Sequence, residues 1–150
     1  MAIHPQYMAV DGHQEVSSRV LGLYSSLAFT PPPGQFTVLA SLVLASTTTL
    51  KVISLATGSK CLPAARLPDQ GDALHDSHAE TLARRAAIRW FFEEIGRSIA
   101  GEGSQWIEIG DDKRYNLKSG VRIHMYISTP PCTDSLSSSY VHHSRFFQRR

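Results

Sequence analysis

The feature that most constrains the fold is a continuous apolar segment, FTVLASLVLA, at residues 36–45. The segment is too short for a long helix and has the β-branched residues typical of a buried strand. Residues 50–55 (LKVISL) are predicted to form its hairpin partner or neighbouring strand, with residues 46–49 as the turn. The two segments therefore predict adjacent strands of a buried sheet.

Three further segments have a clear period. Apolar residues at helical spacing predict a helix over residues 15–27 and a second, stronger helix over residues 77–95, which Gly96 would cap at its C-terminus. Residues 121–128 alternate between apolar and polar side chains and predict a strand. The element order is α-β-β-α-β, which indicates an α/β layered sheet. Residues 56–75 are predicted to form a long irregular loop, and loops of that length are usually functional.

The composition narrows the functional classes. A chain of 150 residues with 42% hydrophobic residues forms one domain, and its formal net charge of +2 does not by itself require a nucleic-acid partner. Two cysteines provide no disulfide framework and fit a reducing compartment. No apolar run approaches the roughly 20 residues that span a bilayer, and the N-terminus lacks the pattern of a secretory signal. We therefore expect an intracellular protein, cytoplasmic or nuclear, with no membrane partner.

Two motifs carry chemistry: HDSHAETLARR at residues 75–85 and STPPC at residues 128–132. A His-Ala-Glu ahead of a helix and a Pro-Cys after a strand are typical of zinc-dependent nucleobase deaminases, in which the metal activates a water molecule and a glutamate moves protons. The pattern predicts His78 and Cys132 as ligands of Zn²⁺ and Glu80 as the proton shuttle.

Each motif also has a purely structural interpretation. Ser77 and Glu80 form the sequence of a capping box, with Ser77 as the N-cap residue of the helix. A single His78 is more often a surface or core histidine than a ligand, and a free Cys132 is often an inert buried thiol. Separately the motifs are weak, but together and in this order they favour a deaminase.

The central helix offers another clue. At 3.6 residues per turn, five residues fall on one stripe of this helix, and Arg85 and Phe92 lie at its edge. The apolar end of the stripe indicates that the stripe is buried. Its residues are Glu80, Arg84, Ile88, Phe91 and Ile95. An arginine in a buried face needs an anion to pair with. Glu80 is one such partner at i, i+4 spacing, but two adjacent arginines favour phosphate, so the stripe also predicts a bound polyanion.

These residues resemble one family: the adenosine deaminases acting on tRNA and their relatives that edit double-stranded RNA. HDSHAETLARRAAIRWFFEEI resembles the metal-binding helix of that family, and VRIHMYISTPPC resembles its cysteine-bearing strand. GSKCLP at residues 58–63 resembles its Gly-Thr/Ser-Lys-Cys loop, and FTVLASLVL its first core strand. The N-terminal part, with YSSL followed by PPPGQFTVLASLVL, is most similar to the tRNA branch, which converts adenosine 37 of alanine tRNA to inosine.

The resemblance implies a cytidine-deaminase-like α/β/α fold and hydrolytic deamination of adenosine in the tRNA anticodon loop. It places Ser59 and Lys60 against the substrate nucleotide, with the lysine near a phosphate. It also places Asp76, Arg84 and Arg85 around a buried inositol hexakisphosphate.

The chain departs from the family after Cys132. Thr133-Asp134-Ser135-Leu136 replaces the family's Gly-Asp-Ala-Ser. The family's second cysteine ligand lies tens of residues further on and no cysteine follows Cys132, so we expect the third zinc ligand to be missing. The tail at residues 133–150 has no convincing period. Cys61 lies in the substrate loop and is not expected to substitute as a ligand, although His142 or His143 could do so chemically.

We therefore expect residues 1–150 to form a single, incomplete domain of this family, because a catalytic zinc site normally uses three protein ligands. The alternative is a catalytically inactive module that retains RNA or inositol-phosphate contacts. A free-nucleoside or cytidine deaminase is disfavoured, because Ser135 replaces the second cysteine of the Pro-Cys-x-x-Cys motif in those enzymes.

Overall fold

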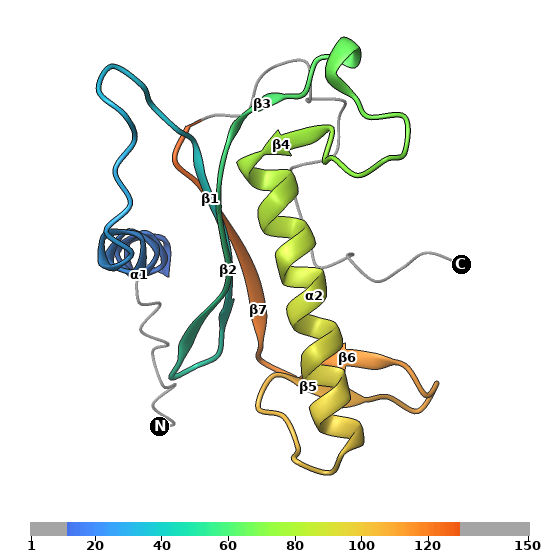
Figure 1. Ribbon diagram of the computed structural model, residues 1–150. Coiled ribbons are helices and arrows are strands. Elements are labelled where there is room, and N and C mark those ends of the chain that lie inside the picture. Colours follow the sequence, from blue (N-terminus) through green and yellow to red (C-terminus); the bar gives the residue numbers. More distant parts are fainter. Residues whose placement is uncertain (1–11, 130–150) are drawn as a thin grey trace, which may run out of the picture.

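The computed structural model of the protein describes residues 12–129 (Figure 1). Their order is helix, two long strands, a small two-stranded ribbon, a long helix, a second small ribbon and a last strand. The elements are α1 (Gly12–Ser26), β1 (Leu39–Ala45), β2 (Leu50–Thr57), β3 (Ser59–Cys61), the short 3₁₀ helix η1 (Ala64–Arg66), β4 (Asp76–His78), α2 (Ala79–Ile99), β5 (Ile107–Ile109), β6 (Tyr115–Leu117) and β7 (Arg122–Ile127).

The main sheet has three antiparallel strands in the order β2-β1-β7, with α1 on one face and α2 on the other (Figure 1). β1 is the central strand, and its side chains alternate between the two faces. Leu42 and Leu44 pack on the α2 side, whereas Leu39 and Val43 pack with α1. The mixed α/β content is as predicted, and the sheet is small and antiparallel. The cytidine-deaminase-like arrangement of the whole fold remains a prediction.

The buried stripe of α2 differs from the predicted one. Four residues at i, i+4 spacing face the sheet: Ala79, Ala83, Ala87 and Phe91. Arg84 and Ile88 are exposed, so their predicted burial is wrong, and Arg85, which was predicted at the edge of the stripe, is exposed as well. A row of alanines lets the helix backbone approach the sheet closely, and the neighbouring arginine row is then rotated out of the interface. Burial of these arginines therefore does not support a bound polyanion.

Both predicted ends of α2 also need correction. Ser77 belongs to β4, the N-cap residue is His78, and its side chain makes no capping hydrogen bond, so the capping box is not formed. Gly96 lies within the helix, which continues to Ile99. Gly101 follows with a φ of 88°, the left-handed conformation that commonly ends helices and favours glycine.

Two short ribbons were not predicted from the sequence. β3 and β4 form one of them, within and beside the segment predicted to be a loop. β5 and β6 form the other, in what was predicted to be a polar connection, and the buried residues Trp106 and Ile107 anchor it in the core beneath α2. Within residues 12–129, no helix is both long and apolar enough to cross a membrane.

Candidate metal centre at the β3–β4 ribbon

The β3–β4 ribbon lies at the N-terminal end of α2 (Figure 1). Its antiparallel register pairs Ser59 with His78, Lys60 with Ser77, and Cys61 with Asp76. Directly paired residues share a face of a ribbon, and so do residues two positions apart on one strand. The register therefore gathers four polar side chains on one face: Ser59, Cys61, Asp76 and His78.

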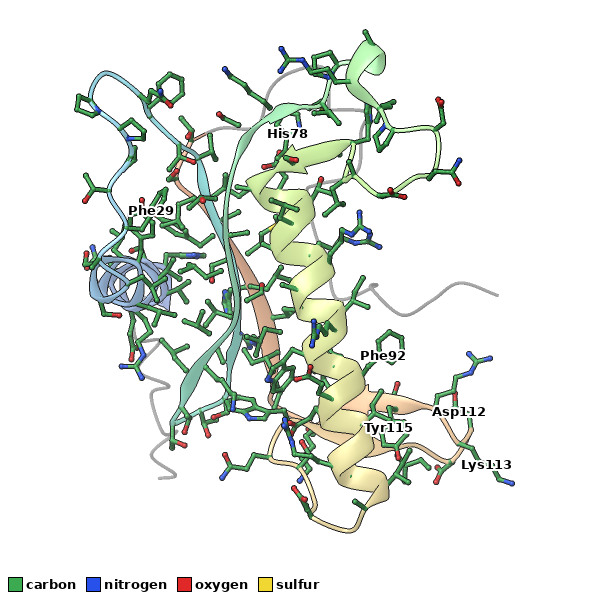
Figure 2. The ribbon with its side chains drawn as sticks, in the orientation of Figure 1. Phe29, His78, Phe92, Asp112, Lys113 and Tyr115 are labelled. Atoms are coloured by element: carbon green, nitrogen blue, oxygen red, sulfur yellow. The ribbon has the colours of Figure 1, made fainter. Side chains whose placement is uncertain are left out.

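Three of these side chains bring their donor atoms together. The His78 Nδ1 atom lies 2.9 Å from Asp76 Oδ1 and 3.4 Å from Cys61 Sγ, and the Cys61 thiol donates to Asp76 Oδ1 over 3.9 Å. Among the described residues, they form the one group of three histidine, cysteine or acidic side chains close enough to share a metal ion. Figure 2 labels His78 at the junction between the ribbon and α2.

Asp76 is held in place by the start of α2. Its Oδ1 atom accepts a hydrogen bond from the His78 backbone N–H over 2.9 Å, and its Oδ2 atom accepts one from Thr81 Oγ1 over 3.0 Å. The backbone hydrogen bond from His78 is the main reason that the pKa of the Asp76 carboxyl lies below its usual value, and the His78 and Thr81 side chains add to the effect. The carboxylate is therefore charged at neutral pH and fixes the orientation of the His78 ring.

The junction itself is tied to the main sheet through Gly58. The Gly58 N–H donates to the Val38 carbonyl over 3.0 Å, and the Gly58 carbonyl accepts from the Ala79 N–H over 3.1 Å. Ala79 begins α2, so Gly58 satisfies one of the backbone donors that every helix start leaves without a partner inside the helix. The sheet thus fixes where α2 starts, and with it the position of His78.

Glu80 lies in the first turn of α2, two residues after His78, and its side chain is half-buried. A carboxylate in this position is favoured by the positive end of the helix dipole. The predicted metal ligand and the predicted proton shuttle therefore come from one rigid junction.

The other predicted site residues do not all lie on the same face of the ribbon as His78. Ser59 lies on the same face of the ribbon as His78, whereas Lys60 is exposed and lies on the opposite face. Arg84 and Arg85 are exposed on α2, one turn beyond the junction. Cys132 and residues 133–150 lie outside the described residues, and the role of Cys132 as a zinc ligand stays a prediction.

Cys61 was expected to lie in the substrate loop and not to act as a metal ligand, yet its Sγ atom lies 3.4 Å from His78 Nδ1. Its exposed thiol has a raised pKa because of desolvation and the neighbouring charge and hydrogen-bond acceptor of Asp76. The donor set fits zinc, because imidazole nitrogen, thiolate sulfur and carboxylate oxygen are the ligands this ion takes in proteins.

Comparison with known proteins decides the family. Residues 54–146 match the model of the adenosine-deaminase (editase) domain. The chain belongs to this family. This editase domain chain is 34% identical over 139 residues to tRNA-specific adenosine deaminase 1 of Saccharomyces cerevisiae, an alignment that covers 83% of the chain and 35% of that protein.

Two more relatives show the breadth of the editase family. Identity is 37% over 86 residues with tRNA-specific adenosine deaminase 1 of Schizosaccharomyces pombe, covering 55% of the chain and 22% of that protein. The identity is 36% over 89 residues with double-stranded RNA-specific editase Adar of Drosophila melanogaster, an alignment that covers 57% of the chain and 13% of that protein. The chain thus spans about a third or less of the length of these relatives. The predicted family is confirmed.

Proposed function

We propose that this editase domain chain acts in the zinc-dependent hydrolytic deamination of adenosine to inosine in RNA, with tRNA as the substrate. The observation that carries the proposal is the junction of β4 and α2. It holds His78, oriented by Asp76, two residues before Glu80. This is the arrangement that deaminase chemistry needs, because a metal ligand and a proton carrier must meet the same water molecule.

Each residue has a defined part in this proposal. His78 and Cys132 hold the zinc ion, and Asp76 keeps the His78 ring in place. Zinc, when bound, supplies the acidity that makes a hydroxide nucleophile available near neutral pH. Glu80 accepts the proton of the attacking water and delivers it to the amino group that leaves C6 of adenine.

The choice of tRNA is supported by how far the similarity extends. The match to the yeast tRNA-specific enzyme covers 83% of the chain, against 57% for the fly double-stranded RNA editase. We assign adenosine 37 of alanine tRNA as the target. A nucleotide in the anticodon loop is already single-stranded, which lowers the cost of flipping it by about a few kcal/mol. Such a substrate agrees with the predicted cytoplasmic or nuclear location.

RNA contacts are assigned to the ribbon. Ser59 shares the face that carries His78, and the exposed Lys60 ammonium is available to a phosphate on the other face. Binding of inositol hexakisphosphate by Asp76, Arg84 and Arg85 remains a proposal from the family resemblance, without the support of burial. Asp76 is already engaged by His78 and Thr81.

A second candidate is a catalytically inactive module that binds RNA or inositol phosphate. It is favoured by one observation: Ser135 stands where cytidine deaminases have a second cysteine ligand. A site with two protein ligands holds zinc weakly. The two candidates differ in whether inosine is formed.

The test is incubation of the zinc-loaded chain with an anticodon stem-loop of alanine tRNA, followed by quantification of inosine by mass spectrometry after nuclease digestion. The proposed activity gives inosine at position 37, and Glu80→Gln lowers its rate by about 10²–10⁴-fold. Glu93→Gln, an exposed glutamate on the same helix, is the control and should match the wild type. Binding of the stem-loop without any inosine would support the inactive module and refute the activity.

A further inference from the structure

We propose that Cys61 is itself a metal ligand and that Cys61, Asp76 and His78 together form a divalent-metal site on the β3–β4 ribbon. The proposal deepens the zinc site of the proposed function, but it concerns metal binding and can be tested without any deamination. It assigns to the same ion a thiolate ligand that comes before His78 in the sequence, in addition to Cys132 after it. When the ion is bound, Asp76 Oδ1 becomes a ligand in place of the hydrogen bond that it shares with His78 Nδ1.

The distances between the three donor atoms support the proposal. A tetrahedral zinc ion with bonds of about 2.3 Å to sulfur and about 2.0–2.1 Å to nitrogen or oxygen separates its sulfur ligand from the others by about 3.6 Å, and its nitrogen and oxygen ligands by about 3.3 Å. The observed separations are 3.4 Å from Sγ to Nδ1, 3.9 Å from Sγ to Oδ1 and 2.9 Å from Nδ1 to Oδ1. All three pairs are within about half an ångström of what one ion requires.

The surroundings hold the donors in this arrangement. Cys61 and Asp76 are directly paired in the ribbon, so the backbone register sets their separation. The Thr81 hydroxyl donates a hydrogen bond to Asp76 Oδ2, and outer contacts of this kind orient metal ligands. The Cys61 side chain is exposed, which gives an ion access from solvent.

The competing explanation is a hydrogen-bonded cluster with no affinity for metal. In that case His78 and Asp76 form an ion pair, and the Cys61 thiol simply donates to the Asp76 carboxylate. Removing the Cys61 sulfur would then leave metal binding by the chain unchanged. The two explanations differ in a signal that only a metal–thiolate bond produces.

The experiment is a Co²⁺ titration of the full metal-free chain, followed by absorption spectroscopy. A thiolate ligand gives a charge-transfer band in the near ultraviolet, and tetrahedral coordination gives intense visible bands. We expect one Co²⁺ per chain, a charge-transfer band that persists in Cys132→Ser, and a weakened or absent band in Cys61→Ser. The dissociation constant of Cys61→Ser should rise by at least the roughly 10–100-fold that loss of an outer-shell contact costs. Ser77→Ala, on the opposite face of the ribbon, is the control and should match the wild type.

Three results would overturn the proposal: no Co²⁺ binding, an unchanged band in Cys61→Ser, or complete loss of the band in Cys132→Ser with binding unaffected in Cys61→Ser. Equal weakening in both cysteine variants supports it, since Cys61 is then one of two thiolate ligands.

A second measurement does not depend on the folding of a variant. The wild-type chain is alkylated with iodoacetamide with and without Zn²⁺, and modification of each cysteine is quantified by peptide mass spectrometry. Protection of Cys61 by zinc, reversed by a chelator, supports the proposal, and equal alkylation of Cys61 in both samples contradicts it. Neither readout involves inosine, so failure of the proposed activity and failure of this site are distinguishable.

Discussion

Gly58 passes so close to Ser77 that a Cβ atom added to the glycine would stand 1.9 Å from the Ser77 carbonyl oxygen. The obstacle is a backbone atom, so it cannot be relieved by rotation of a side chain. Gly58 also bonds to Val38 and Ala79 through its own backbone. A side chain at this position would therefore force apart the sheet, the β3–β4 ribbon and the start of α2.

We expect Gly58→Ala to destabilise the fold by about 1–3 kcal/mol, the usual cost of inserting atoms into a packed region. We also expect it to weaken Co²⁺ binding, because the displaced ribbon carries Cys61 and Asp76. Urea unfolding and the Co²⁺ titration measure the two effects. Gly96→Ala is the control: an alanine Cβ there meets nothing within 4 Å, and the change should stabilise the exposed helix by about 0.5–1 kcal/mol. Equal effects of the two substitutions would refute the close approach.

The adjacent residues Phe91 and Phe92 test the orientation of α2. Phe91 is 9% exposed and packs in the core, whereas Phe92 is 70% exposed and points away from the sheet (Figure 2). Phe91→Ala should cost about 3–5 kcal/mol of unfolding free energy. Phe92→Ala should change it by no more than about 0.5 kcal/mol. The urea midpoints of the two variants measure the difference, and a larger loss for Phe92→Ala would mean that the helix is rotated from the described position.

The elements that could be predicted are those with strong local signals. The run at residues 36–45 and the alternation at residues 121–128 are hydrophobic patterns that need no knowledge of their neighbours. The orientation of α2 could not be found in this way. Ala79, Ala83 and Ala87 are less hydrophobic than the isoleucine and phenylalanine residues of the helix, so they contribute little to its hydrophobic pattern. β5 and β6 were missed because strands of three residues are too short to show a period.

The same difference between local and long-range signals applies to the residues of the site. His78 and Glu80 belong to one local motif, so the sequence was sufficient to single them out. Cys61 could not be placed, because its distance from His78 depends on the register of two strands separated by the 62–75 segment. Such a register is set by tertiary contacts, among them the hydrogen bond from the Leu62 N–H to the His75 carbonyl.

Thr81 provides a test of how the metal ligands are oriented. Its hydroxyl donates to Asp76 Oδ2, and valine has nearly the same shape but no donor. We expect Thr81→Val to weaken Co²⁺ binding by about 10–100-fold, as is typical when an outer-shell partner is lost. Thr47→Val, an exposed threonine on the β1–β2 turn, is the control and should bind like the wild type. Unchanged affinity in Thr81→Val would show that Asp76 needs no support from α2.

The free energy of unfolding should depend on pH through Glu94. Its buried carboxylate accepts hydrogen bonds from the Ser104 hydroxyl and the Arg97 guanidinium. Burial would raise the pKa of Glu94, but these two hydrogen bonds and the charge of Arg97 outweigh it, so the pKa lies below its usual value of 4.5. Glu94 therefore binds a proton more readily in the unfolded chain than in the folded one. The stabilisation is complete above the usual pKa and is lost as the pH falls through the folded value.

Glu94→Gln removes this charge at every pH. At pH 7 it should lower the unfolding free energy by about 1–3 kcal/mol, because charge-assisted hydrogen bonds to a buried group are lost. In acid, where the wild type also loses the charge, the two proteins should converge. Urea unfolding at a series of pH values from neutral to about 3, below the ordinary glutamate range, measures the convergence. Glu93→Gln, whose exposed pair with Arg89 is screened by solvent, should follow the wild type throughout. A constant gap between Glu94→Gln and the wild type would mean that packing, and not the charge, accounts for the loss.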